Sequence, residues 1–519
     1  MASAMTTTPH SKHAHDDRGH HDHGPAVTHD RGVRIELDPA FIARLLSALP
    51  KGCLLTDPED TVTYESDGLF HLHEKPLAVV LPETEAQVAA VLRACRDFKV
   101  PIVPRGAGTG LAGGALPHAQ GILMSLTKIK ALVEVDVAAR QARVQPGHTN
   151  LAISNKVAHH GLFYAPDPSS QLASSIGGNV AENSGGVHCL KYGLTVHNVL
   201  GLRIVTSDGD AIAIGEGSLD QPGYDVLSIL NGSEGLLALV TEVRVKLLPL
   251  PPAIRVLLAF FPTTEDAGNA VGAIIGSGII PAGLEMMDTK SMEAAESFMP
   301  LNLRLDSGAG LLCELDGLSE EVDEMTARVT ALMEHCNGFD IRIADDEAQR
   351  GRLWWARKGC YPALVKIAND VYICDSTVPR RKLGSVMAKI DALSAHHAIP
   401  VAQMFHAGDG NIHPVLYYDS TKPGESDRAD ALASDILKLV IAEGGTVSGE
   451  HGVGSEKLKG MCMQFASGEI EAFFGVRRAF DPHEVLNPDK AIPTLHRCAE
   501  FGSMRIRFGQ DPFAHLPRF

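Results

Sequence analysis

Five glycines fall within the eleven residues from Pro104 to Gly114, which read Pro-Arg-Gly-Ala-Gly-Thr-Gly-Leu-Ala-Gly-Gly. Without Cβ atoms, consecutive backbone N–H groups of such a segment can turn toward one anion and form a nest. Thr109 adds a hydroxyl donor and Arg105 adds a positive charge. The segment therefore predicts an anion-binding loop, and a wide surface turn is the alternative interpretation.

The stretch from Gly108 to Gly113 also matches the G-x-G-x-x-G pattern of nicotinamide-binding folds. That pattern works only where the third glycine lies in a helix whose N-terminus faces the pyrophosphate. Here Gly114 and Pro117 follow at once, and an apolar strand is expected over Gly121–Leu126. No helix can start there, so a nicotinamide site is rejected.

A second glycine-dense run, Ile176–Gly186, reads Ile-Gly-Gly-Asn-Val-Ala-Glu-Asn-Ser-Gly-Gly and follows Pro166-Asp-Pro168. A third candidate, Gly232-Ser-Glu-Gly235, precedes an expected strand over Leu236–Val245. Two such runs about 70 residues apart suit a long ligand that lies along the backbone. Its phosphates would contact one run and a flat ring would lie near the other.

Composition excludes several classes of protein. The chain has 519 residues and a net charge of −17, and no local basic patch is evident, so nucleic-acid binding is not expected. Apolar stretches such as Val271–Gly283 fall short of the ~18 residues that a membrane span needs. The nine cysteines are scattered with no C-x-x-C, which disfavours zinc ribbons and ferredoxin-type clusters. The N-terminus shows no apolar signal region, and a reducing cytoplasm is the simplest interpretation.

Four regions are expected along the chain. Residues 1–33 contain seven of the 24 histidines among Asp, Gly and Pro, which is typical of a disordered tail. Pro249, Pro251 and Pro252 indicate a boundary between a domain at 34–250 and another at 251–500, and 501–519 form an extension. Helices are expected over Pro39–Leu49 and after a capping box that starts at Thr84.

Two histidine motifs lie in the second half: His406-Ala-Gly-Asp-Gly-Asn-Ile-His413 and Gly449-Glu-His-Gly-Val-Gly454. A tight turn lets both imidazoles of the first motif face one point, where a carboxylate and a third histidine from the second motif complete an N/O cluster. Such a cluster suits Zn, Mn or Fe(II). Two unrelated histidine pairs near turns are the alternative. Neither G-x-S-x-G nor HExxH occurs, which removes serine hydrolases and the commonest zinc peptidases.

With these motifs in place, the chain resembles the FAD-dependent D-2-hydroxy-acid dehydrogenases of the vanillyl-alcohol oxidase and p-cresol methylhydroxylase superfamily, over roughly residues 40–510. The ending Ile492-Pro-Thr-Leu-His-Arg-Cys-Ala-Glu-Phe-Gly502 is similar to the D-subunit family of bacterial glycolate oxidases. The resemblance implies an α+β fold. A two-subdomain FAD-binding domain would come first, followed by a C-terminal α+β FAD-linked oxidase domain.

The resemblance also implies which residues contact FAD. These are Pro104, Arg105, Gly106, Ala107, Gly108, Thr109, Gly110, Gly113, Gly114, Pro166, Asp167, Gly177, Gly178, Asn179, Asn183, Gly186, Glu234, Val240 and Asn411, the last toward flavin or substrate. Some relatives attach the flavin covalently through a histidine in the first loop. This loop has none, so non-covalent FAD is expected.

The same resemblance assigns roles in catalysis. The metal ligands would be His406, His413 and Glu450, and His451 would be the general base. Arg357 would bind the substrate carboxylate, with Tyr361 as a further substrate contact, although Arg357 could instead be an ordinary salt-bridged helix residue. Cys374 stands where relatives acting on hydroxyglutarate carry a lysine, which favours a small substrate with one carboxylate.

The function implied is oxidation of glycolate to glyoxylate, by transfer of a hydride from C2 to flavin N5. Electrons would leave through a second flavin-domain subunit and an iron–sulfur subunit toward a membrane acceptor. Membrane contact would then be peripheral, through these partners, and the chain would lie at the cytoplasmic face of the cell membrane. A stand-alone D-lactate or other D-2-hydroxy-acid dehydrogenase and a non-catalytic flavin scaffold are the alternatives.

Overall fold

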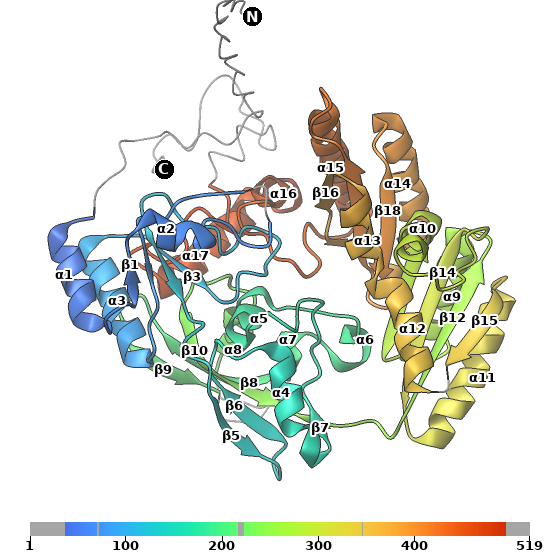
Figure 1. Cartoon of the computed structure of the whole chain (residues 1–519), viewed down its shortest axis with the longest axis horizontal. Helices are drawn as coiled ribbons and strands as arrows, with labels where there is room; N and C mark the ends of the chain where they lie inside the picture. Colours follow the sequence, from blue (N-terminus) through green and yellow to red (C-terminus); the bar gives the residue numbers. More distant parts are fainter. Residues whose placement is uncertain (1–36, 70–71, 216–222, 345, 495–519) are drawn as a thin grey trace, which may run out of the picture. The chain divides into compact units, whose positions relative to one another are not determined.

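The computed structural model describes residues 37–494 except 70–71, 216–222 and 345. The chain divides into two units, and the described residues belong to the second, compact one. The predicted His-rich tail at 1–33 and the extension at 501–519 lie outside the described residues. The architecture below is that of the second unit (Figure 1).

A small sheet near the start of the chain carries the first glycine-rich loop. Its strands run in the order β1 (Leu54–Leu55), β2 (Ala78–Val80), β4 (Ile122–Ser125) and β3 (Ile102–Arg105), with β2, β4 and β3 parallel. No helix lies between β3 and β4, in a stretch that is described throughout, so the helix that a nicotinamide-binding G-x-G-x-x-G motif requires is missing there, as expected from the sequence.

Two predicted helices cover this sheet. The first, α1 (Pro39–Ala48), buries Phe41 and Leu45 against α3 (Glu85–Phe98). At the start of α3, the Thr84 hydroxyl accepts from the Gln87 N–H at 3.3 Å. The Gln87 side chain, however, accepts from the Glu83 N–H at 2.7 Å, one residue before the position that a full capping box requires.

A second sheet of five antiparallel strands completes the first half. Its order is β5 (Leu132–Asp136), β6 (Gln141–Val144), β10 (Leu239–Lys246), β8 (Val199–Val205) and β9 (Ala211–Ile214). Central strand β10 alternates buried and half-buried residues, as expected for a strand with one face on the core. The second glycine-rich run begins α5 (Ile176–Glu182), which contacts β10.

Shorter elements connect these sheets. They are α2 (Pro58–Thr61), η1 (Val62–Tyr64), α4 (Asn150–Val157), η2 (Ala158–His160), β7 (Leu162–Phe163), α6 (Cys189–Tyr192), α7 (Thr195–Asn198), α8 (Val226–Leu230) and β11 (Leu248–Pro249).

From Ala253 onward the chain builds an eight-stranded antiparallel sheet. Its path is β15 (Phe339–Ala344), β12 (Ala253–Phe261), β14 (Ala309–Gly317), β13 (Gly283–Asp288), β18 (Val401–His406), β19 (Asn411–Tyr418) and β16 (Asp370–Ile373), and β17 (Ser376–Thr377) pairs with β19. Helices cover both faces (Figure 1). They are α9 (Thr264–Gly276), α10 (Thr289–Phe298), α11 (Ser319–His335), α12 (Glu347–Lys358), α13 (Cys360–Ile367), η3 (Arg380–Lys382), α14 (Leu383–His397) and α15 (Glu425–Ala442).

Strand β12 shows how the two faces are separated. Its residues Leu257, Ala259 and Phe261 belong to the core under α9, α11, α14 and α15. The alternate residues Val256, Leu258 and Phe260 belong to a second core under α10, α12 and α13. Because side chains alternate between faces, a strand buried on both sides reads as a continuous apolar run.

The last described segment returns to the first sheet after α16 (Leu458–Gln464) and α17 (Ser467–Phe480). The Ile102 N–H donates to the Val485 carbonyl at 2.8 Å, and the Asn487 N–H donates to the Ile102 carbonyl at 2.8 Å. Val485 and Leu486 are buried in the same core as α1 and α3. Residues from both ends of the chain therefore build the region that holds the first glycine-rich loop.

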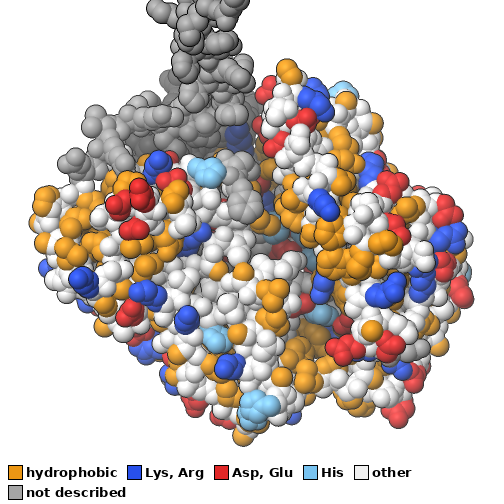
Figure 2. Space-filling model, in the orientation of Figure 1, with side chains coloured by type: hydrophobic (Ala, Val, Ile, Leu, Met, Phe, Trp, Pro, Cys, Tyr) orange, Lys and Arg blue, Asp and Glu red, His pale blue; other side chains and the backbone are white. Residues whose placement is uncertain are grey.

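Within the described residues, no helix is long and apolar enough to cross a membrane. On the face that Figure 2 shows, Lys and Arg side chains are interspersed with Asp and Glu.

Candidate active site

A cleft runs along the first glycine-rich loop and encloses about 1320 Å³, its open mouth included. The loop from Pro104 to Ala115 and the start of α5 supply much of its wall. A Cβ on Gly106 would lie 2.3 Å from the Ser175 hydroxyl, whose oxygen caps α5 by accepting from the Gly178 N–H. Glycine at 106 therefore lets the loop approach the N-terminus of that helix.

Most residues predicted to contact FAD line this cleft. They are Pro104, Arg105, Gly106, Ala107, Gly108, Thr109, Gly110, Gly114, Gly177, Gly178, Asn179, Glu234 and Val240. The cleft is also lined by Glu450 and His451 from the second histidine motif. The structure thus brings the glycine-rich loops of the first half beside a motif of the second half.

Six predicted cofactor contacts do not line the cleft: Gly113, Pro166, Asp167, Asn183, Gly186 and Asn411. The Asp167 carboxylate instead pairs with His188 Nδ1 at 2.7 Å. Asn183 ends α5 with a φ of +51°, and its side chain accepts from the Val196 N–H. A Cβ on Gly186 would lie 2.5 Å from the Asp167 carbonyl oxygen. These residues support the cleft from outside, and direct contact with FAD stays a prediction.

Glu234 has a defined partner other than a cofactor. Its two carboxylate oxygens accept from the N–H groups of Val453 and Gly454 at 2.8 and 2.7 Å. The Asn487 side-chain amide donates to the Glu234 carbonyl at 2.6 Å and to the Gly114 carbonyl at 3.0 Å. Glu234 therefore holds the loop that carries Glu450 and His451 against the glycine-rich loop.

Several cleft residues were not found from the sequence. Hydroxyls line the wall at Ser169, Ser170, Ser174, Ser175, Ser184 and Ser233. Glu182, at the end of α5, lines it as well, and its buried Oε2 atom has no hydrogen-bond partner among the described residues. Their only sequence signal is proximity to the glycine-rich runs, which does not separate lining residues from neighbouring ones.

The predicted metal ligands lie together. Strand β18 ends at His406 and strand β19 carries His413, whose rings are perpendicular with centroids 5.0 Å apart. Glu450 Oε1 lies 3.3 Å from His406 Nε2 and 3.4 Å from His413 Nε2. One donor atom from each residue lies within 4.8 Å of the other two. Both histidines are buried, so three donors face one point away from bulk water.

Electrostatics hold this cluster in an ionised state. Burial raises the pKa of Glu450, but the imidazoles of His406 and His413 beside its carboxylate outweigh burial and bring that pKa well below its usual value. Burial lowers the pKa of His406, whereas the nearby charges of Glu285 and Glu450 raise it well above the usual value. The carboxylate of Glu450 is therefore available to a cation.

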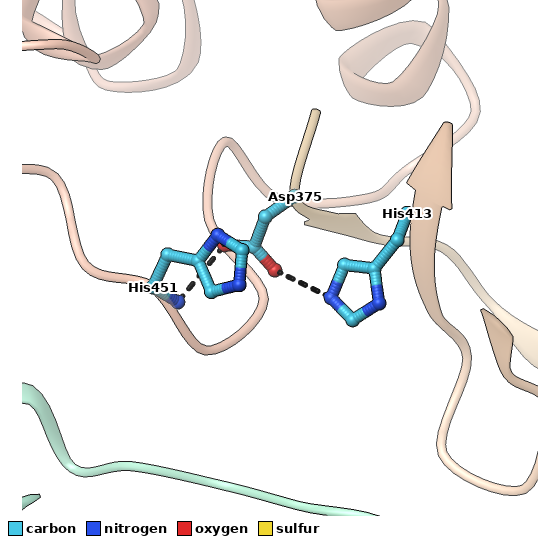
Figure 3. A group of neighbouring side chains, drawn as sticks. All are labelled: Asp375, His413 and His451. Atoms are coloured by element: carbon cyan, nitrogen blue, oxygen red, sulfur yellow. Dashed lines mark hydrogen bonds and ion pairs between the residues drawn. The ribbon is translucent and has the colours of Figure 1, made fainter. Parts of the chain in front are cut away.

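Asp375 organises the adjoining loop. Its buried carboxylate accepts from the N–H groups of Gly449, Glu450 and His451 at 3.0, 3.1 and 3.0 Å. Lys457 Nζ donates to the same carboxylate at 2.9 Å. The imidazole of His413 also turns toward Asp375, 3.5 Å from its Oδ1 atom (Figure 3). Asp375 follows Cys374, and the sequence reasoning gave it no role.

His451 meets two requirements of a general base. Its ring stacks on that of His413 at 5.4 Å with an interplanar angle of 7°, and it lines the cleft. Burial lowers the pKa of His451 to about 4, which the charge of Asp375 offsets only in part. The imidazole is therefore neutral near pH 7 and can accept a proton.

Arg357 reaches the cluster through a residue that sequence reasoning missed. Glu285, in the middle of β13, is fully buried. Its Oε1 accepts from His406 Nδ1 at 2.8 Å, and its Oε2 forms an ion pair with Arg357 Nε at 2.9 Å. No sequence motif distinguishes a single glutamate inside an apolar strand, so only its unusual burial identifies Glu285 as a candidate functional residue.

The remaining predicted residues lie in different environments. Tyr361 is half-buried in α13, packs against the core that contains Trp354, and makes no hydrogen bond within the described part of the chain. Asn411 is buried, and a Cβ on Gly449 would lie 2.2 Å from its Oδ1 atom, so it packs against the second histidine motif. Cys374 is buried in the core under α14 and α15, where burial raises the pKa of its thiol.

The donors fit a divalent cation. His413 Nε2 is buried yet makes no hydrogen bond of good geometry with any described residue, and carboxylate oxygens of Glu450 and Asp375 lie 3.4 and 3.5 Å away. Two imidazole nitrogens and one carboxylate oxygen suit Zn, Mn or Fe. The cleft likewise fits a long cofactor, since a Cβ on Gly110 would find only Glu182 within 4 Å and the loop opens onto free space.

Two family models match the chain. Residues 76–215 match the FAD binding domain, and residues 250–491 match the C-terminal domain of FAD linked oxidases. Among solved structures, p-cresol methylhydroxylase has a TM-score of 0.72 at 18% identity, covering 88% of this chain and 97% of that one. Alkyldihydroxyacetonephosphate synthase has a TM-score of 0.70 at 19% identity, covering 87% of this chain and 86% of that one. At such identities the likeness establishes the fold, and it confirms the fold class expected from the sequence.

Sequence relatives are much closer. The glycolate oxidase subunit GlcD of Escherichia coli K12 is 53% identical over 90% of this chain and 93% of its own length. GlcD of Bacillus subtilis is 36% identical over 83% and 92%. A D-lactate dehydrogenase of Anaerostipes hadrus is 30% identical over 88% and 98%. This chain is an FAD-dependent oxidoreductase, and it belongs to the FAD-linked oxidase family that includes the glycolate oxidase subunit GlcD.

Proposed function

We propose that this chain oxidises glycolate, or a similarly small D-2-hydroxy acid, to the corresponding 2-oxo acid. The substrate loses its hydroxyl proton and a hydride from C2, and bound FAD supplies the acceptor for that hydride. The observation that carries the proposal is that Glu450 and His451 line the cofactor cleft and also belong to the histidine cluster. The relatives named glycolate oxidase subunit support glycolate as the substrate.

The chain's own residues divide the remaining work. Neutral His451 accepts the hydroxyl proton, because its lowered pKa leaves the ring unprotonated near pH 7. Arg357 binds the substrate carboxylate, since within the described residues only Glu285 pairs with its guanidinium. Asp375 fixes the loop bearing His451 through three backbone N–H groups. These roles account for a base that lines the cleft, a rigid support for its loop, and an anion-binding group that is linked to the histidine cluster through Glu285.

We further propose that His406, His413 and Glu450 hold a divalent cation. Such an ion lowers the pKa of a bound hydroxyl, as it does for bound water. The buried donors and the ionised Glu450 support this assignment. Metal analysis of the purified protein tests it, because an apoprotein that gains no metal on dialysis against Zn²⁺ or Mn²⁺ would contradict it.

We also propose that the chain works as one subunit of a complex. No C-x-x-C occurs in its sequence, so a separate iron–sulfur subunit would receive the electrons, together with a second flavin-domain subunit. The word "subunit" in the names of the relatives supports this. Membrane contact would be indirect, through these partners, at the cytoplasmic face. Fractionation of cells with and without the partner subunits tests the location.

One experiment tests substrate and assembly together. Anaerobic reduction of the flavin by glycolate and by D-lactate gives the preference of the half-reaction, which needs no partner. Steady-state turnover with and without partner proteins then shows whether reoxidation needs them. Faster reduction by D-lactate, together with rapid turnover of the isolated chain, would favour a stand-alone D-lactate dehydrogenase, the activity named for the 30% identical relative.

A further inference from the structure

Glu285 lies where the eight-stranded sheet meets the histidine cluster. It pairs directly with His406 across the antiparallel strands β13 and β18, and both side chains project from the face that α10, α12 and α13 cover. The residue is fully buried. A fully buried carboxylate is costly unless its partners satisfy it, so its contacts are informative.

One oxygen of Glu285 fixes the imidazole of His406. Oε1 accepts from Nδ1 at 2.8 Å, which places the proton of a neutral ring on Nδ1 and the lone pair on Nε2. Nε2 is the atom that faces Glu450, at 3.3 Å. Carboxylates that orient a metal-binding histidine in this way raise its basicity as a ligand.

The other oxygen fixes Arg357. Oε2 lies 2.9 Å from Nε, and within the described part of the chain no other ion pair or hydrogen bond holds this guanidinium. The two terminal Nη groups remain available for a planar anion. The side chain is only 9% exposed, so Glu285 also neutralises a nearly buried cation.

We propose that Glu285 is a positioning residue for two groups that act on the substrate. Through its contact with His406 it orients a ligand of the metal, and through its contact with Arg357 it orients the group that binds the substrate carboxylate. The inference rests on the proposed function of these two residues. Its distinctive consequence is that one substitution weakens two chemically unrelated binding events, neither of which Glu285 would contact.

The substitution Glu285→Gln tests this on FAD-loaded protein. Glutamine keeps the shape but carries no charge, so it removes the ion pair with Arg357 and leaves one oxygen that can accept from His406 Nδ1. The Kd of Zn²⁺ or Mn²⁺, from competition with a chromogenic chelator, should rise ~10–100-fold. The Kd of acetate, a carboxylate with no hydroxyl to oxidise, should also rise several-fold when followed by the flavin absorbance. Neither readout depends on turnover.

Asp288→Asn is the matched control. Asp288 is a buried carboxylate on the same strand, where it caps α10 by accepting from the Ser291 N–H, and asparagine can still act as an N-cap. This control should keep both Kd values. If Glu285→Gln fails to retain FAD, Glu285→Asp replaces it, because the shorter side chain keeps the charge but cannot reach both donors.

The outcomes separate the inference from the proposed function. His406→Ala and Arg357→Ala should weaken metal and acetate binding, respectively, if the proposed roles are right. If they do so while the Glu285 variant keeps wild-type affinity for either ligand, the inference is overturned and the proposed roles stand. If the wild type binds neither metal nor acetate, both fail. Loss of both affinities in the Glu285 variant but not in Asp288→Asn, with FAD content unchanged, supports the inference.

Discussion

Glu234 and Glu182 offer a matched pair of buried carboxylates for testing what holds the catalytic loop. Glu234 satisfies two backbone N–H groups of the loop that follows His451. Glu182 lines the cleft nearby and has no hydrogen-bond partner for Oε2. Burial and the charge of Glu234 raise the pKa of Glu182 well above its usual value. The same Glu→Gln change should therefore loosen the loop at position 234 and leave it almost unaffected at position 182.

The expected magnitude follows from the contacts. In Glu234→Gln one oxygen remains for one N–H, while the other N–H faces an amide NH₂ group. Losing one hydrogen bond to a charged group and weakening the second should lower the free energy of local loop opening by about 3 kcal/mol. Local opening of the loop should then become ~100-fold more frequent, since each 1.4 kcal/mol is a factor of ten. Glu182→Gln removes no hydrogen bond and should change opening by less than about twofold.

Hydrogen exchange measured by mass spectrometry on peptides spanning residues 449–457 reports this opening directly. The peptide that contains Val453 and Gly454 should exchange much faster in Glu234→Gln, with peptides of α11 unchanged as an internal reference. Equal exchange in Glu234→Gln and wild type would refute the reasoning, as would a Glu182→Gln variant that opens the loop just as much.

Three further predictions concern other parts of the molecule. Burial alone would lower the pKa of His188, but the two carboxylates beside it raise that pKa well above the usual value. Protonated His188 therefore stabilises the folded state fully below about pH 6.5, and this stabilisation is lost as pH rises through the folded-state pKa. The difference in free energy of unfolding between wild type and His188→Gln, from denaturant titrations, should shrink steadily above pH 6.5, and a difference independent of pH would contradict this. His451→Ala should keep bound metal and FAD but slow anaerobic flavin reduction by ~10²–10⁴-fold in stopped-flow experiments. His406→Ala should slow flavin reduction and also lose the metal, as metal analysis would show. Equal metal loss in both variants would instead make His451 one of the metal ligands. Gly106→Ala places a Cβ 2.3 Å from the Ser175 hydroxyl and should reduce the FAD content measured by absorbance, while an unchanged flavin-to-protein ratio would mean that the loop can shift.

The parts of the fold that sequence could predict are those with a local signal. The helix at Pro39–Ala48 begins after an aspartate cap and shows helical spacing of Phe41 and Leu45, and it was expected within one residue. The histidine cluster was also predictable, because two histidines on the strands that flank a tight turn and a glutamate of the second motif supply its donor atoms. Glycine spacing likewise marked the loops that line the cleft.

Parts that depend on distant contacts could not be predicted. Asp167 lies between two prolines beside a glycine-rich run, yet it pairs with His188, which in turn contacts Glu314 Oε1 at 2.9 Å. Glu285 is hidden in an apolar strand, and its role depends on the register that places it opposite His406. The pairs His188–Glu314 and Glu285–His406 each join residues more than 100 positions apart, which no local pattern encodes.

The segment at Val485–Asn487 packs beside strand β3 of the first sheet, and this contact constrains the order in which the chain can fold. Ile102 exchanges backbone hydrogen bonds with Val485 and Asn487, and Leu486 fills the core beneath α1 and α3. During synthesis on the ribosome, this core stays incomplete until almost 490 residues have emerged, and contacts of such long sequence separation form slowly. The glycine-rich loop gains its support from Asn487 and Lys490 only then. Capture of the flavin should therefore be a late, post-translational event, and nascent chains that stop before residue 480 should expose an unfinished sheet edge to chaperones.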